Sequence, residues 1–91
     1  STMQNAEAWR GIFESWPEAI PREGLIITSF GETIAFNDFM VSAGIVLIDR
    51  ERPDSAGARK VMIAYDAISA VKLTGILELA RFQVMGFQPP M

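Results

Sequence analysis

The apolar side chains near the start of the chain recur with the period of a helix. Within residues 4–16 one stripe recurs at intervals of three or four positions and consists of Ala6, Trp9, Phe13 and Trp16. Ile12 lies beside this stripe. Asn5 is a residue type that caps helices, and Pro17 ends the pattern because proline interrupts helical hydrogen bonding. Gly11 costs about 1 kcal/mol relative to alanine in a helix interior, so we expect docking to hold this helix.

After a connector with two prolines at residues 17–24, the pattern changes to short stretches typical of strands. These stretches are rich in β-branched and aromatic residues, and turn residues separate them. They cover residues 25–30, 32–41, 44–52, 59–68 and 69–74. In the second stretch the alternation is interrupted near Asn37 and Asp38, which predicts a β-bulge there.

One helix followed by five short strands predicts a mainly β fold, in which a small, strongly bent antiparallel sheet closes into a barrel. Closure is expected because short strands in an open sheet leave unpaired edges. A chain of 91 residues fits one domain, with the barrel at residues 25–74 and a C-terminal arm at residues 75–91. Residues 1–2, which precede Met3, are interpreted as an expression scar.

The C-terminal arm is mostly apolar but fits neither the helical nor the strand period. The favoured interpretation is a short helical turn at residues 76–81 followed by an extended segment. Because an exposed tail of this composition favours aggregation, we expect it to lie on its own barrel or on that of a neighbouring subunit.

Composition narrows the range of partners. Apolar residues make up 49% of the chain and charged residues 21%, which is more apolar surface than a small monomer readily buries, so we expect a homo-oligomer. The net charge of −3 disfavours nucleic acid and anionic membranes, and an RNA partner would need a locally basic patch. No apolar run reaches the roughly 18 residues of a membrane span. With no cysteine and no signal-peptide pattern, the sequence favours a cytoplasmic protein over a secreted protein whose signal peptide has been removed.

The chain contains neither histidine nor cysteine. It therefore lacks an imidazole base that titrates near neutral pH and a thiolate that can act as nucleophile or soft metal ligand. The acidic residues are too scattered along the chain to form a loop that binds a hard cation. Ser69 and Lys72 have the spacing of a Ser-Lys catalytic pair, but the favoured interpretation is an ordinary strand serine and an exposed lysine. We expect no catalytic residue, metal or cofactor, and hence a non-enzymatic binding or scaffold module.

Residues 36–41 and residues 62–73, FNDFMV and MIAYDAISAVKL, resemble two motifs of the Sm-like family, the ring-forming RNA-binding barrels built from a helix and five bent strands. Residues 36–41, FNDFMV, followed by an apolar strand, are similar to the first motif, which contains an acidic residue, an aromatic or similar group, methionine and asparagine. Asp38, Phe39 and Met40 match this motif, whereas Val41 stands in place of the asparagine.

Residues 62–73, MIAYDAISAVKL, resemble the paired fourth and fifth strands of the same family. The Arg-Gly pair of the eukaryotic second motif is missing. No histidine stands beside Tyr65, where the bacterial form has a basic signature. The resemblance covers about residues 25–74. It implies the fold and ring assembly more strongly than RNA binding, because the base-binding positions depart from the family.

The candidate residues for binding a ligand or RNA come from two places in the chain: Asn37, Asp38, Phe39, Arg59 and Lys60. The Phe39 ring is a candidate stacking platform for a base, although an aromatic residue within a strand is more often part of the core. Arg59 and Lys60 follow a loop at residues 53–58, and Arg50 and Arg52 precede it, so a hairpin would bring these basic residues together. Acidic neighbours largely neutralise them, which favours a solvated hairpin tip over a phosphate-binding patch.

The candidate residues for an oligomer interface are aromatic and come from the predicted helix and arm: Trp9, Phe13, Trp16, Phe82 and Phe87. Tryptophan-rich apolar stripes occur both in protein cores and at the anchors of interfaces. Two arrangements therefore stay open for the helix, which packs either across an open end of its own barrel or against a second subunit.

Overall fold

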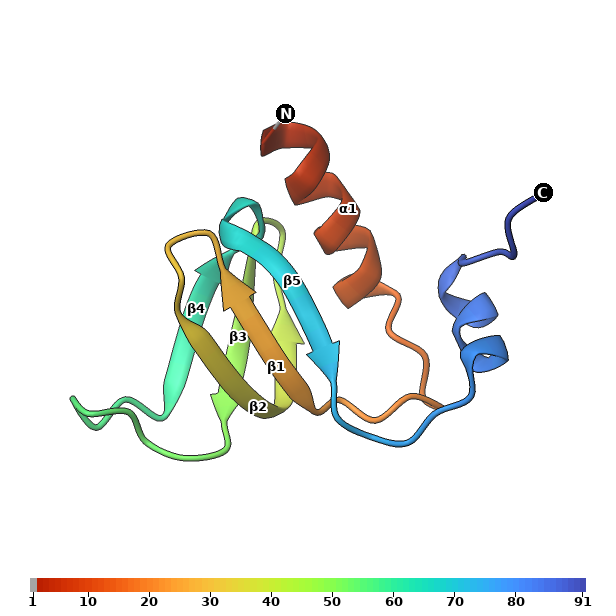
Figure 1. The fold of residues 1–91 in the computed structure, drawn as a ribbon. Helices are drawn as coiled ribbons and strands as arrows, with labels where there is room; N and C mark the ends of the chain where they lie inside the picture. Colours follow the sequence, from red (N-terminus) through yellow and green to blue (C-terminus); the bar gives the residue numbers. More distant parts are fainter. Residues whose placement is uncertain (1) are drawn as a thin grey trace.

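The computed structural model describes residues 2–91, and their side chains from residue 4 onward. This part of the chain contains one α-helix and five strands, in the order α1 (Thr2–Glu14), β1 (Gly24–Thr28), β2 (Thr33–Val41), β3 (Ile45–Arg50), β4 (Lys60–Ala64) and β5 (Ile68–Leu73). Two 3₁₀ segments, η1 (Tyr65–Ala67) and η2 (Leu79–Met85), lie before and after β5 (Figure 1).

The strands form a single antiparallel sheet in the order β4-β3-β2-β1-β5. The prediction of a mainly β fold with an N-terminal helix is therefore confirmed. Over the residues that the structure describes, β4 and β5 are the two edges of the sheet, and the sheet is not closed between them. The predicted closure into a barrel stays a prediction.

The sheet is strongly bent, and the reason is the short connection between its two edges. Only η1 connects β4 to β5, although three strands lie between them in the sheet (Figure 1). Strands about 4.8 Å apart would place the edges of a flat sheet about 19 Å from each other. A 3₁₀ segment rises about 2 Å per residue, so η1 covers less than half of that distance. The edges must therefore approach each other where the chain passes between them.

The predicted elements are present, and several boundaries differ. The register of β2 against β3 shifts between Phe36 and Asp38, which confirms the predicted bulge. The predicted strand at residues 59–68 ends early, because the chain turns through η1 to reach the other edge of the sheet. The helical turn of the arm lies at η2 rather than at residues 76–81.

The prediction that Asn5 caps the helix is wrong. Asn5 lies inside α1, and its side-chain amide donates hydrogen bonds to the backbone carbonyls of Ile68, at 3.2 Å, and Asp66, at 3.5 Å. A tertiary contact has taken the side chain that a cap would use. These bonds hold α1 against η1 and the start of β5.

The core lies between the concave face of the sheet and α1. Phe13 docks the helix, since its ring centroid lies 4.9 Å from that of Phe39 and 5.7 Å from that of Trp16. Each such aromatic pair is worth about 0.5–1.5 kcal/mol beyond the burial of its area. The buried apolar residues are Phe13, Trp16, Ile20, Ile26, Ile34, Phe36, Phe39, Val46, Ile48, Ile63, Tyr65 and Ile68.

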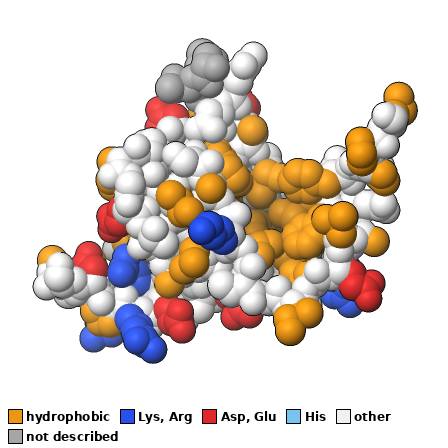
Figure 2. All heavy atoms as spheres, viewed as in Figure 1, with side chains coloured by type: hydrophobic (Ala, Val, Ile, Leu, Met, Phe, Trp, Pro, Cys, Tyr) orange, Lys and Arg blue, Asp and Glu red, His pale blue; other side chains and the backbone are white. Residues whose placement is uncertain are grey.

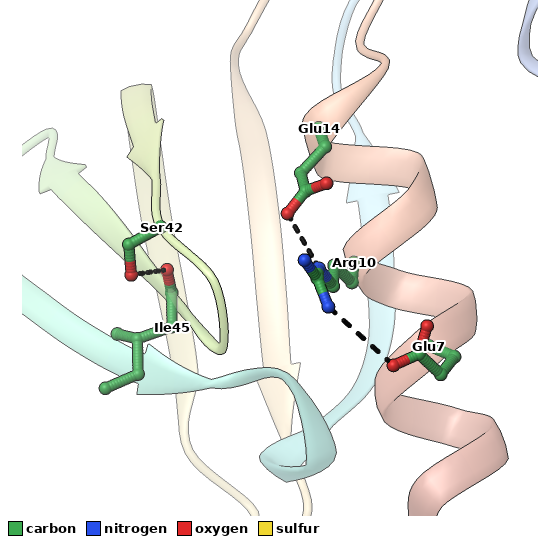
Figure 3. A network of polar contacts seen from close by, with 5 residues as sticks. All are labelled: Glu7, Arg10, Glu14, Ser42 and Ile45. Atoms are coloured by element: carbon green, nitrogen blue, oxygen red, sulfur yellow. Dashed lines mark hydrogen bonds and ion pairs between the residues drawn. The ribbon is translucent and has the colours of Figure 1, made fainter.

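The outward face of α1 is charged. The Arg10 guanidinium pairs with the carboxylates of Glu14, at 2.8 Å, and Glu7, at 3.9 Å (Figure 3). The hydrogen bond to Glu14 raises the pKa of Arg10 above its ordinary value. Figure 3 also shows the Ser42 hydroxyl donating to the carbonyl of Ile45 at the β2–β3 turn, at 3.1 Å. Exposed contacts of this kind add little stability, so apolar docking is the main attachment of the helix.

Candidate functional site

An apolar groove of about 420 Å³ lies between α1, β5 and the C-terminal arm, residues 75–91. The arm stands away from the rest of the molecule in Figure 1, and Figure 2 shows the hollow between them covered by hydrophobic side chains. Every residue that lines the groove is apolar: Ala8, Trp9, Ile12, Trp16, Val71, Leu73, Phe82, Met85 and Phe87. Such a lining suits apolar side chains and offers no charged group to a polar substrate.

Three elements build the groove, each with its own periodicity. On α1, Trp9, Ile12 and Trp16 are three and four positions apart, so they share one face of the helix. On β5, Val71 and Leu73 are two positions apart and lie on the same side of the strand. The third wall is η2 and the residue pair that follows it.

The chain turns sharply at the end of η2. Gly86 has a φ of 97°, in the left-handed region that glycine adopts readily, and its N–H donates to the carbonyl of Gln83 at 3.0 Å. This turn lets Phe87 line the same groove as Phe82 and Met85. The local sequence thus folds the arm into an apolar wall.

The arm also has exposed apolar side chains outside the groove. A second hollow, of about 790 Å³, lies along the arm and shares Phe82 and Phe87 with the groove. The large apolar residues of the arm that are exposed to solvent are Ile76, Leu79, Val84, Phe87 and Met91. The arm therefore presents apolar surface on more than one side.

A separate apolar row crosses the outer face of the sheet. Met40 on β2 is the register partner of Leu47 on β3, which is the partner of Met62 on β4. Both methionines are exposed. This outer row, Met40, Leu47 and Met62, belongs to other strands than the groove does.

The structure brings four of the five predicted interface residues together. Trp9, Trp16, Phe82 and Phe87 all line the groove. Phe13 does not, because it is only 2% exposed and packs between α1 and the sheet. The prediction that Phe13 contacts a second subunit is therefore wrong. Phe13 packs inside its own chain, as in the alternative arrangement in which the helix covers an end of its own sheet.

The sequence did not single out Ala8 and Met85 as parts of the groove. The signal for Ala8 was its separation of four residues from Ile12, which places both on one helical face. The corresponding signal for Val71 and Leu73 is their separation of two residues, which places both on one face of a strand. No local signal identified Met85, because its position depends on how the arm lies.

The predicted ligand-binding residues of β2 have different environments. Phe39 is 5% exposed and belongs to the core, so its ring offers no stacking surface in this structure. Asn37 and Asp38 are exposed at the bulge. The Asp38 carboxylate accepts the N–H of Phe39, at 2.8 Å, and pairs with the guanidinium of Arg22, at 3.6 Å.

The strand register brings Lys60, one of the two predicted basic residues, close to Asp38 and Asp49. Asp38, Asp49 and Lys60 are successive partners across β2, β3 and β4, and the ammonium group of Lys60 lies 2.9 Å from the Asp49 carboxylate. Lys60 is thus neutralised within its own sheet, which disfavours a phosphate-binding patch. Arg59 is exposed next to Lys60.

The loop at residues 53–58 is held by Asp54. Its carboxylate accepts the backbone N–H groups of Ala58, at 2.8 Å, and Ala56, at 2.9 Å. These hydrogen bonds, with that from Ala58 as the largest cause, lower the pKa of Asp54 below its ordinary value. The loop is a self-contained turn, as expected for a hairpin tip.

Within residues 2–91, no three acidic side chains gather in a way that could hold a metal ion. Over the same part of the chain, no helix combines the length and the apolar character needed to cross a membrane.

In comparisons with known proteins, no family model, curated protein or solved structure matches this chain. The fold and the groove define the protein as a small antiparallel β-sheet protein with a docked N-terminal helix and an apolar groove at the edge strand β5. The resemblance to the Sm-like family stays a prediction.

Proposed function

We propose that this protein is a self-associating binding or scaffold module and not an enzyme. The observation that carries the proposal is the groove lined only by apolar side chains, next to an arm with five exposed large apolar residues. Apolar patches larger than a few hundred Å² are uncommon on monomers and mark sites of association. Covering such surface is favourable by about 25 cal/mol per Å².

The edges of the sheet support the same proposal. Edge strands carry N–H and C=O groups that face away from the sheet, and these groups pair readily with another chain. β4 and β5 are both edges over the described residues. Barrel-like curvature is part of the proposal and is supported by the short η1 connection.

The non-enzymatic and cytoplasmic parts of the proposal rest on composition. The chain has no histidine and no cysteine, and the groove contributes no polar side chain that could act as an acid, a base or a nucleophile. A chain without cysteine cannot form the disulfides that are common in small secreted proteins.

Sedimentation equilibrium of the full chain tests self-association. The expected result is a mass above the 10.0 kDa of one chain at micromolar concentration. Because the proposed contact is apolar, raising the salt concentration should leave this mass unchanged or increase it. A mass of one chain throughout the micromolar range contradicts the proposal.

A second candidate function is RNA binding of the Sm-like kind. It is supported by the match at Asp38, Phe39 and Met40, and by the exposed side chains of Asn37 and Arg59. Fluorescence anisotropy of a short labelled oligoribonucleotide tests it. Binding at low salt that weakens as salt rises, and that Arg59→Ala reduces more than Arg81→Ala in the arm, is the expected result. No binding at low salt rejects this candidate.

A further inference from the structure

We propose that two copies of this chain associate by placing the C-terminal arm of each copy in the apolar groove of the other. This inference rests on the proposed self-association and names its interface. The occupant of the groove is thus a defined segment of a second copy, residues 75–91.

The chemistry of the groove selects the occupant. No charged side chain lines it, and the indole N–H groups of Trp9 and Trp16 are its only side-chain hydrogen-bond donors, so it is poorly suited to a phosphate or a charged peptide. The polar atom of Trp16 is already used, because the indole N–H donates to the carbonyl of Ile20 at 2.8 Å. A segment that fills the groove must therefore offer apolar side chains.

The 17 residues of the arm are the densest source of such side chains among the described residues. Among the described residues, five of the ten exposed large apolar residues lie in the arm. Leu79 is 88% exposed and Val84 is 66% exposed, although Phe82 and Met85 of the same segment line the groove. One side of the arm therefore forms a groove wall, and the other side is free to contact a second copy.

The connection to β5 lets the arm reach a second copy. Residues 74–78 link β5 to η2 without regular structure. Five residues extend up to about 17 Å, so the arm can reach a neighbouring chain while β5 keeps its pairing with β1. Around a two-fold axis the arm-in-groove contact forms twice, which closes the assembly at two copies.

The size of the contact suits a stable dimer. The 17 residues of the arm and the six groove residues outside it come from one copy. An ordinary stable interface uses about 20–30 residues from each side. The groove and the arm therefore provide enough surface for a dimer without the outer row Met40, Leu47 and Met62.

Sedimentation equilibrium of three variants of the full chain tests the proposal. Leu79→Glu and Val84→Glu each place a carboxylate on the free side of the arm, at positions whose exposure leaves the monomer able to fold. Met62→Glu is the matched control, since Met62 is 75% exposed but lies in the outer row. Wild type and Met62→Glu should form dimers, whereas either arm variant should raise Kd by about 30-fold or more. Circular dichroism checks that each variant is folded.

Tryptophan fluorescence gives a second measurement at the groove itself. Trp9 and Trp16 are the two tryptophans of the chain, and both line the groove. Diluting the wild-type protein should shift their emission to longer wavelength over the same concentrations at which the mass falls to one chain. Leu79→Glu should show the longer wavelength at concentrations where the wild-type protein is a dimer.

The outcomes separate this inference from the proposed function. A wild-type protein that is monomeric throughout the micromolar range overturns both. Three other outcomes overturn the arm-in-groove contact while self-association stands. In the first, both arm variants leave the oligomer intact; in the second, Met62→Glu dissociates it; in the third, the oligomer dissociates without a change in tryptophan emission.

Discussion

The indole N–H of Trp16 donates a 2.8 Å hydrogen bond to the backbone carbonyl of Ile20. Ile20 is buried and lies in the connector that follows the helix, where its own N–H donates to the carbonyl of Pro17 at 3.2 Å. The bond therefore ties the end of the helix region to the chain that leads into β1. It also orients the indole so that its ring packs on Phe39 and forms one end of the groove.

Trp16→Phe should destabilise the protein. The substitution keeps an aromatic ring in the core but leaves the buried carbonyl of Ile20 without its donor, which costs about 1–3 kcal/mol. Urea unfolding followed by circular dichroism measures the change. Trp9→Phe is the control, because the structure of residues 2–91 assigns no hydrogen bond to that indole, and its effect should be smaller. Equal effects of the two substitutions would contradict this account.

Gly24→Ala should also destabilise the protein, because the β1 and β5 backbones approach closely there. A Cβ at Gly24 would overlap the carbonyl oxygen of Lys72, and overpacking of this kind costs about 1–3 kcal/mol. Gly11→Ala is the matched control. A Cβ at Gly11 meets open space in α1, so this variant should gain about 1 kcal/mol from helix propensity. Opposite signs in thermal or urea unfolding are expected, and a neutral Gly24→Ala would refute the close approach.

Tyr65→Phe should stabilise the protein. The hydroxyl of Tyr65 is buried without a hydrogen-bond partner, and the residue is 1% exposed. A buried polar group without a partner costs about 1–3 kcal/mol, so removing it should raise the free energy of unfolding by about 1 kcal/mol. Urea unfolding at neutral pH measures this. A loss of stability would mean that the hydroxyl has a partner in solution.

The same tyrosine should make the protein less stable at alkaline pH. Burial is the largest cause that raises the pKa of Tyr65 above its ordinary value of 10.0. The unfolded chain therefore loses the phenol proton first, so this contribution is complete below pH 10 and is lost as the pH rises through the higher pKa of the folded state. Because this is the only tyrosine, ultraviolet absorbance of the tyrosinate reports it directly. A midpoint at or below 10.0 in the folded protein would be inconsistent with the buried site.

The bulge and the helix illustrate what local patterns could predict. The interruption of the alternation near Asn37 and Asp38 predicted the register shift that β2 shows, because alternation reports directly on which side chains face the core. The apolar stripe predicted the helix for the same reason. The end of β4 was missed since Tyr65 continues the alternation of Val61 and Ile63, and the turn depends on where the next strand must start.

The sequence by itself determined the mainly β class, the amphipathic helix, the surplus of apolar side chains and the lack of histidine and cysteine, because periodicity and composition are properties of neighbouring residues. Only the tertiary structure decided that Phe13 and Phe39 belong to the core while Trp9 and Phe87 line a groove. These placements depend on contacts between distant parts of the chain, such as the bond from Asn5 to Ile68 across 63 positions. The local pattern marks a side chain as apolar, but the packed chain determines which surface covers it.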